Sequence, residues 1–217
     1  MSTVDEQLMQ IIDCDINIMK LKEDAVYDKD SCAWFCSKQD NNWLLSNMAG
    51  QMPVFFPKGV RWNSSEQLYQ SSKYFPGTIC LPELTNEKKD VEPDVRKRIA
   101  SMTNARGAKM TQKCAVKAGL VRDDWEDKDF EVRIHSMMWV LELKLRDNPF
   151  TFAKELALTG AKEIVEISRK DYFWGCKEVD GKLVGKNVLG KLLMLLRERA
   201  EKLRKGEFSY PVGFLLD

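Results

Sequence analysis

The most restrictive pattern in this chain is an apolar stripe at helical spacing near its C-terminal end. Between residues 187 and 203, apolar residues recur every three or four positions, which places them on one face of a helix of about 3.6 residues per turn. The stripe consists of Leu189, Leu192, Leu193, Leu196, Ala200 and Leu203. Because a helix with one apolar face has to bury it, we expect this helix to form part of a domain core.

Upstream patterns predict a mainly helical α+β fold. Helices are predicted at residues 66–74, 94–102, 104–118, 130–146 and 149–159. Ser64 or Ser65 is suited to cap the first of these helices, and Pro93 is suited to begin the second.

Strands are predicted in two places. Aromatic and β-branched residues among turn formers predict the only real sheet at residues 33–60, and a short strand is predicted at 163–168. We expect one domain over residues 31–217, with its small β region near the N-terminal third, and an amphipathic extension over residues 1–30. The charged run 86–90 is typical of a solvated loop.

Composition disfavours several functions. The 34 basic residues balance 33 acids, so no net field draws the protein onto nucleic acid or a membrane. Six cysteines without a CxxC pair, together with one histidine, disfavour a zinc site. No apolar run approaches the ~18 residues of a membrane span, and the N-terminus does not look like a signal peptide. We expect a soluble cytoplasmic protein with reduced thiols and no cofactor.

The first polar island lies on the helix predicted at residues 66–74. At spacings of four and three, Glu66, Gln70 and Lys73 share one helix face, so their side chains can converge on a ligand. Aromatic residues in the same segment are Trp62, Tyr69 and Tyr74. A carboxyl group that large rings shield from water is suited to proton transfer near neutral pH. A solvated face with a weak Glu–Lys pair is the alternative.

The second island joins an acid, aromatics and glycines ahead of the last helix. Asp171 precedes three consecutive aromatics, of which at least one should face a cleft, although Asp171 can also be a simple turn former or N-cap. Gly185, Asn187 and Gly190 lie where helix N-terminal amides favour a phosphate or a ribose hydroxyl, but glycines in a plain loop explain them too. Two such islands, far apart in sequence, suggest one composite pocket.

The remaining candidates are three lysines and the histidine. Lys109 lies in a helical stripe with Lys113 and Lys117, which fits either a phosphate contact or a solvated face. Lys73 and Lys191 are further candidates for phosphate contacts. His135 is expected to pack within a helix, because no cysteine or serine motif nearby forms a dyad with it.

Four segments carry a resemblance to a known family. They are Leu45-Ser46-Asn47, Ser65-Glu66-Gln67 with Gln70 and Lys73, Phe173-Trp174-Gly175, and the run from Asn187 through Gly190 to Met194. In order and rough spacing, from about Trp34 to Ala200, they resemble the NADAR family, also called YbiA-like proteins. The resemblance implies a mainly helical α+β fold and a hydrolytic pocket without a metal.

The resemblance also implies an activity and its residues. Family members look like N-glycosidases that act on early riboflavin-pathway intermediates or remove ADP-ribose from a modified base or other acceptor. Glu66 matches the family's essential glutamate, and Asp171 and Trp174 match its late acid and aromatic. Positions that line the pocket by this match are Ser46, Asn47, Trp62, Asn187 and Gly190. This chain departs at Gln67, where many members have histidine, in a longer loop after Gly175, and in the extension over residues 1–30.

We therefore hypothesise hydrolysis of an N-ribosidic bond, with Glu66 and Asp171 as catalytic residues. Substrate-binding residues would be Ser46, Asn47, Trp62, Gln70, Lys73, Lys109, Trp174, Gly175, Asn187 and Gly190. The partner would be a nucleotide-type small molecule or an ADP-ribosylated macromolecule, and a nucleic-acid base is one option. The sequence leaves the choice of substrate and the oligomeric state open. The alternatives are a module that binds ADP-ribose or a related nucleotide without cleaving it, and a helical scaffold whose extension engages a partner protein.

Overall fold

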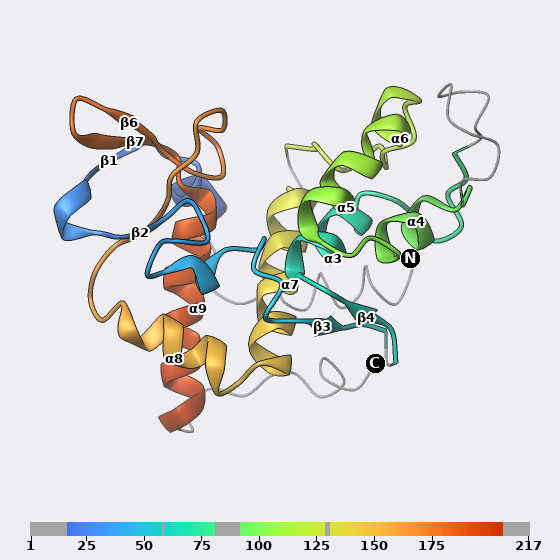
Figure 1. Ribbon diagram of the computed structural model, residues 1–217. Helices are drawn as coiled ribbons and strands as arrows, with labels where there is room; N and C mark the ends of the chain where they lie inside the picture. The colour runs from blue at the N-terminus through green and yellow to red at the C-terminus, as the bar shows by residue number, and fades with distance from the viewer. Residues whose placement is uncertain (1–16, 58, 81–91, 129–130, 206–217) are drawn as a thin grey trace. The chain divides into compact units, whose positions relative to one another are not determined.

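The computed structural model describes residues 17–57, 59–80, 92–128 and 131–205 (Figure 1). The chain divides into two compact units, which we call the terminal unit, residues 1–46 and 148–217, and the central unit, residues 47–147. The loop predicted at 86–90 and the first part of the predicted extension lie outside the described residues. Helices predominate and the sheets are small, which confirms a mainly helical α+β fold.

The central unit is built around one long helix. Its helices are α3 (Ser65–Ser71), α4 (Val95–Ala100), α5 (Ala105–Thr111), α6 (Lys113–Lys117) and α7 (Val132–Asp147). A two-stranded antiparallel ribbon, β3 (Val54–Phe55) and β4 (Arg61–Trp62), completes it. Helix α3 packs against α4, α5 and α7, and it is buried along its whole length. Two residues of the first polar island, Glu66 and Gln70, thus lie on a buried helix, whereas Lys73 follows the end of this helix at Ser71.

Side-chain caps begin three of these helices, and one of these starts differs from the prediction. Ser64 caps α3, because its side chain accepts the backbone N–H of Gln67, and Asn104 caps α5 in the same way. Asp94, not Pro93, caps α4, so the prediction that Pro93 begins this helix is wrong. A carboxylate accepts hydrogen bonds from the free N–H groups of the first helical turn. Proline accepts none of them, and its only advantage there is that it has no N–H group of its own.

The helix predicted at residues 104–118 is two helices. Gln112 separates α5 from α6, and its backbone carbonyl accepts the hydroxyl of Tyr74 at 3.2 Å. The break therefore coincides with a contact to Tyr74, in the segment that follows α3. The helical periodicity of residues 104–118 gives no sign of this distant contact.

The terminal unit combines small sheets with two longer helices. Its helices are α2 (Ile18–Leu21), α8 (Thr151–Leu158) and α9 (Val188–Lys205), with 3-10 turns η1 (Lys29–Ser31) and η2 (Trp43–Leu45). Its strands are β1 (Ala25–Asp28), β2 (Ala33–Phe35), β5 (Ile164–Glu166), β6 (Lys177–Val179) and β7 (Lys182–Gly185). Strand β2 pairs in parallel with β5, with Trp34 opposite Val165. The apolar stripe of α9 is buried from Leu189 to Leu196, as predicted, and α9 packs against β5, α8 and α2.

The prediction that the only sheet lies at residues 33–60 is wrong. Strands β1, β7 and β6 form an antiparallel sheet outside that range (Figure 1). The β6–β7 turn contains Asp180 and Gly181 with φ of 48° and 77°. Two positive φ values in an Asp-Gly pair are typical of a type I′ hairpin turn, whose backbone twist matches that of the flanking strands. This hairpin signal was present in the sequence and was not recognised.

Candidate functional site

Glu66 lies in the first turn of α3, where Asn47 holds the backbone. The N–H of Glu66 donates to the carbonyl of Asn47 at 3.1 Å, and the hydroxyl of Ser65 donates to Asn47 Oδ1 at 2.9 Å. The Asn47 amide contacts the sulfur of Met137 on α7 at 2.8 Å, and Asn47 is 3% exposed. Asn47 therefore orients the start of α3, and with it the Glu66 side chain, from a buried position.

The Glu66 carboxylate is buried and held by two donors. Glu66 is 5% exposed, and its Oε1 accepts a hydrogen bond of 2.7 Å from Gln70 Nε2, one helical turn away. The Lys109 ammonium on α5 lies 3.5 Å from the same oxygen, while most of the Lys109 side chain remains exposed. Because a buried carboxylate needs hydrogen bonds or a counter-charge, these two contacts stabilise it there. The predicted convergence of Glu66 and Gln70 is thus observed.

Lys73 lies beside two aromatic rings. Its ammonium is 6.0 Å from the ring centroid of Tyr69 and 6.0 Å from that of Trp125, and the two rings are 5.4 Å apart. Burial lowers the pKa of Lys73, and the charge of Lys109 lowers it further, while Glu66 and Glu126 partly oppose the shift. Sequence reasoning missed Trp125. It lies in the segment between α6 and α7, and no local signal connects it to α3.

Two other predicted aromatics take part in packing. Trp62 is 3% exposed, and its indole N–H donates to the carbonyl of Phe56 at 2.6 Å. The hydroxyl of Tyr74 donates to Gln112 Oε1 at 2.8 Å, and burial raises the pKa of Tyr74. Trp62 therefore has little ring surface exposed, and its contact with substrate stays a prediction.

Asp171 organises its own loop in the terminal unit. Its Oδ1 accepts the backbone N–H groups of Phe173 and Trp174, both at 2.9 Å, and its N–H donates to Ser168 Oγ at 3.1 Å. The turn-forming role left open by the sequence is therefore present. Phe173 and Trp174 form an edge-to-face pair with centroids 5.0 Å apart, and Tyr172 is the most exposed of the three aromatics.

The first amides of α9 are bonded to the same loop. The N–H groups of Val188 and Leu189 donate to the carbonyls of Phe173 and Trp174, both at 3.0 Å. The prediction that this helix start offers its amides to a phosphate is therefore not met at Val188 and Leu189. The aromatic loop folds back over the helix end and supplies the acceptors that an anion would otherwise supply.

Asn187 and Gly190 connect α9 to β5. Asn187 is completely buried, its Oδ1 accepts the N–H of Glu166 at 3.2 Å, and its Nδ2 donates to the carbonyl of Ile164 at 2.8 Å. A Cβ on Gly190 would collide with the carbonyl oxygen of Ile164, and one on Gly175 would lie 2.6 Å from the carbonyl oxygen of Glu166. These positions have clear packing roles, and a direct contact with substrate stays a prediction for each.

The predicted site residues fall in both units. The terminal unit holds Ser46, Asp171, Trp174, Gly175, Asn187 and Gly190, and the central unit holds Asn47, Trp62, Glu66, Gln70, Lys73 and Lys109. Ser46 is 2% exposed and follows η2. The composite pocket of the two islands stays a prediction.

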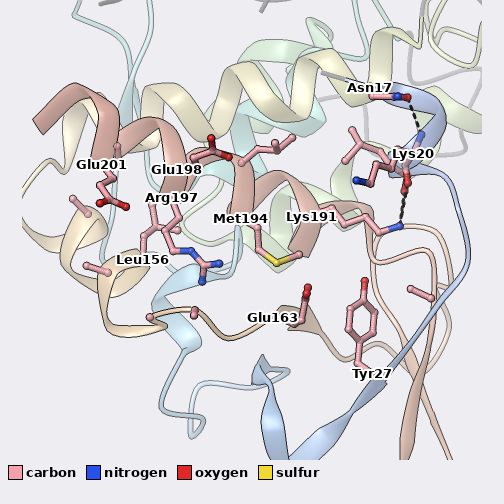
Figure 2. Close-up of a pocket in the computed structure, with 18 of the residues that line it drawn as sticks. Asn17, Lys20, Tyr27, Leu156, Glu163, Lys191, Met194, Arg197, Glu198 and Glu201 are labelled. Carbon is pink, nitrogen blue, oxygen red and sulfur yellow. Dashed lines mark hydrogen bonds between the residues drawn. The ribbon is translucent and has the colours of Figure 1, made fainter. Parts of the chain in front are cut away.

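The terminal unit contains a cavity of about 1280 Å³ lined by α2, α8 and α9 (Figure 2). Two of the cations that line it, Lys191 and Arg197, bind protein groups. Lys191 Nζ donates to the carbonyls of Leu21 at 3.1 Å and Glu23 at 2.7 Å, and Arg197 donates to Thr159 Oγ1 at 2.6 Å. Of the residues predicted to contact substrate or phosphate, Lys191 alone lines this cavity. Since Lys191 caps the carbonyl end of α2, its contacts do not support a phosphate role.

The described residues form neither a cluster of metal ligands nor a helix that could span a membrane. Within the described ranges, no group of three or more His, Cys, Asp or Glu side chains is placed to hold a metal ion. The described helices include none with the length and apolarity needed to cross a membrane.

Comparison with known proteins agrees with this arrangement. The sequence matches the NADAR domain over residues 33–201, which is most of the chain. The chain belongs to the NADAR family. The predicted boundary of this NADAR domain at residue 31 stays a prediction.

Two relatives extend this result. The chain is 28% identical over 174 residues to a protein of Vibrio vulnificus (strain YJ016) named riboflavin biosynthesis protein VVA0006. The match covers 78% of this chain but only 38% of that protein, so the NADAR chain spans little more than a third of the relative's length. The NMR structure of the E. coli protein YbiA superposes with a TM-score of 0.50 at 21% identity, covering 85% of this chain and 96% of YbiA. The expected YbiA-like fold is confirmed.

Proposed function

We propose that this NADAR protein is an N-glycosidase that hydrolyses an N-ribosidic bond, with Glu66 as general acid/base. The observation that carries the proposal is the Glu66 carboxylate, 5% exposed, bonded to Gln70 and placed 3.5 Å from the Lys109 ammonium. A buried carboxylate on a rigid helix start can transfer protons with little reorganisation. Family membership and a relative named for riboflavin biosynthesis support a glycosidase-like role.

The proposed reaction replaces a carbon–nitrogen bond by a carbon–oxygen bond. Water adds to the anomeric carbon, the bond to the nitrogen breaks, and the proton released by water balances the proton gained by the leaving nitrogen. Positive charge grows on the ribose ring during cleavage, and a carboxylate close to the ring stabilises it. Proton transfer by Glu66 would contribute about 10²–10⁴-fold. Asp171 would hold the ribose or share the proton transfer, and Trp174 would stack on the planar leaving group.

The substrate would carry phosphate as well as ribose. Lys109 and Lys73 place two amines near Glu66, and the Tyr69 and Trp125 rings lie beside Lys73. Cations next to aromatic rings suit a nucleotide, whose phosphates and base need both. We propose two substrate classes: an ADP-ribosylated acceptor, such as a guanine base, and a ribosylamino-pyrimidine phosphate of riboflavin biosynthesis.

Release of ADP-ribose or ribose phosphate tests the proposal. ADP-ribosylated guanine DNA, ADP-ribosylated protein and the ribosylaminouracil phosphate are each incubated with wild type, Glu66→Gln and the control Glu163→Gln. Glu163 is an exposed carboxylate of the terminal unit that lines the large cavity. We expect Glu66→Gln to lose at least about 100-fold in kcat on the active substrate, and Glu163→Gln to match wild type.

Two outcomes would contradict the assignment. Full activity of Glu66→Gln would show that Glu66 takes no part in the chemistry. A loss of kcat in Glu163→Gln as large as in Glu66→Gln would indicate that the cavity lined by Glu163 contains the site instead. Tight binding of ADP-ribose without turnover of any substrate would replace the enzyme by a module that reads ADP-ribose.

A further inference from the structure

Gln70 differs from the other described glutamines that are buried in the central unit. Gln67 Oε1 accepts the N–H of Asn63 at 2.6 Å, and Gln112 Oε1 accepts the hydroxyl of Tyr74 at 2.8 Å. Gln70 is 2% exposed, and its Oε1 is buried without a hydrogen-bond donor among the described residues. A buried carbonyl oxygen without a donor costs about 1–3 kcal/mol, so this oxygen calls for an explanation.

The neighbouring carboxylate determines the direction of the Gln70 amide. Nε2 donates to Glu66 Oε1 at 2.7 Å. An ionised carboxylate can only accept hydrogen bonds, so the amide has to turn its NH2 group toward Glu66 and its oxygen away. The amide oxygen, Oε1, is therefore left to accept a hydrogen bond from a donor other than Glu66. That donor would lie close to the proposed general acid/base, because Oε1 belongs to the same amide whose Nε2 is bonded to Glu66.

A sugar hydroxyl next to the reacting carbon meets this requirement. When the anomeric carbon of a ribose lies at the Glu66 carboxylate, the 2-hydroxyl is the closest donor that the ribose itself carries. In glycoside hydrolysis, hydrogen bonds to the 2-hydroxyl strengthen in the transition state. A fixed acceptor at this point would therefore assist cleavage as well as binding.

We propose that Gln70 Oε1 accepts a hydrogen bond from the 2-hydroxyl of the ribose that is cleaved, so that the protein selects ribosides over 2-deoxyribosides. This inference rests on the proposed function, because it takes Glu66 to act at the anomeric carbon. Gln70 has two tasks in this arrangement: its NH2 group orients Glu66, and its oxygen recognises the sugar.

Binding of matched ligand pairs tests the selection. The probes are ADP-ribose and its analogue without the 2-hydroxyl on the terminal ribose, and ribose 5-phosphate with 2-deoxyribose 5-phosphate, each titrated calorimetrically. Wild type should bind at least one ribose form about 10–100-fold more tightly than its deoxy partner, as expected when a buried acceptor loses its donor. This comparison needs no variant and is therefore independent of any folding defect.

Two glutamine variants locate the selection. Gln70→Met keeps the length of the side chain but removes the amide, and Gln112→Met removes a buried glutamine whose bonds lie within the protein. We expect Gln70→Met to bind ribose and deoxyribose forms equally, and Gln112→Met to retain the wild-type preference. If Gln70→Met weakens both forms by the same factor, Gln70 is only structural and the inference fails.

Failure of this inference can be distinguished from failure of the proposed function. Turnover of a riboside and its deoxy analogue at equal rates by wild type, without a difference in affinity, would keep the glycosidase and overturn the role of Gln70. A clear preference for the ribose form without turnover of any substrate would keep the role of Gln70 and overturn the hydrolysis. Absence of binding by all four probes would overturn the inference.

Discussion

Substitution of Asn187 by alanine should unfold the terminal unit more readily without touching the proposed chemistry at Glu66. Asn187 is completely buried between β5 and the start of α9. Its amide forms two hydrogen bonds, to the N–H of Glu166 and to the carbonyl of Ile164. Its φ of 51° lies in the left-handed region, which asparagine tolerates better than alanine.

The expected loss follows from these contacts. A buried backbone group that loses its partner costs about 1–3 kcal/mol, so two such groups cost about 2–6 kcal/mol. Alanine in the left-handed region adds about 1–2 kcal/mol. The total is at least about 3 kcal/mol, a large share of the roughly 5–15 kcal/mol that stabilises a typical domain.

Urea unfolding followed by circular dichroism measures this loss. Asn187→Ala should lower the unfolding midpoint at unchanged slope, because the slope reports the surface exposed on unfolding. Asn187→Gly removes the same two bonds but accepts the positive φ, so it should be about 1 kcal/mol more stable than Asn187→Ala. Asn41→Ala, at an exposed position of the same unit, is the matched control and should change the free energy by less than about 0.5 kcal/mol.

One result would refute this reasoning. If Asn187→Ala unfolds at the same urea concentration as wild type yet loses ligand binding, the amide contacts substrate and its bonds to β5 contribute little. The pocket-lining role that the family resemblance implies for Asn187 would then be correct, and the packing role would be minor.

Two further predictions concern other buried positions. Gly190→Ala should lower the free energy of unfolding by about 1–3 kcal/mol or more, because its Cβ would collide with the carbonyl oxygen of Ile164, and a urea midpoint equal to wild type would contradict this close approach. The single His135 should titrate below pH 6.5, because burial lowers its pKa although Glu131 partly opposes the shift, and the imidazole NMR signal measures this directly. Between pH 6.5 and the lower folded-state pKa the unfolded chain binds more protons, so the free energy of unfolding should fall as pH falls, and His135→Gln should lack this slope. Titration at or above pH 6.5 would contradict the assignment.

Local signals predicted much of the secondary structure. Ser64 caps α3 and Asn104 caps α5 because a side-chain oxygen next to free amides acts within one turn of the chain. The stripe of α9 is buried as its periodicity requires. The β6–β7 hairpin is equally local, because the Asp180-Gly181 pair that forms its turn is itself a hairpin signal in the sequence.

The candidate site was less predictable, because residue type does not reveal a distant partner. Trp125 lies beside Tyr69 and Lys73 only because the segment between α6 and α7 returns to α3. The sequence also predicted a substrate contact for Trp62, but in the fold its indole N–H binds a backbone carbonyl and its ring is buried.

By itself the sequence determined most of the helices, the Ser64 cap, the family resemblance and the presence of Glu66 and Gln70 on one helix face. These properties depend on spacing within a few turns. Tertiary structure decided which polar groups the protein already uses: Asn187 is bonded to β5, whereas Gln70 Oε1 is left without a donor among the described residues. Hydrogen bonds are satisfied by whichever group the fold brings near, and that group is often far away in the chain.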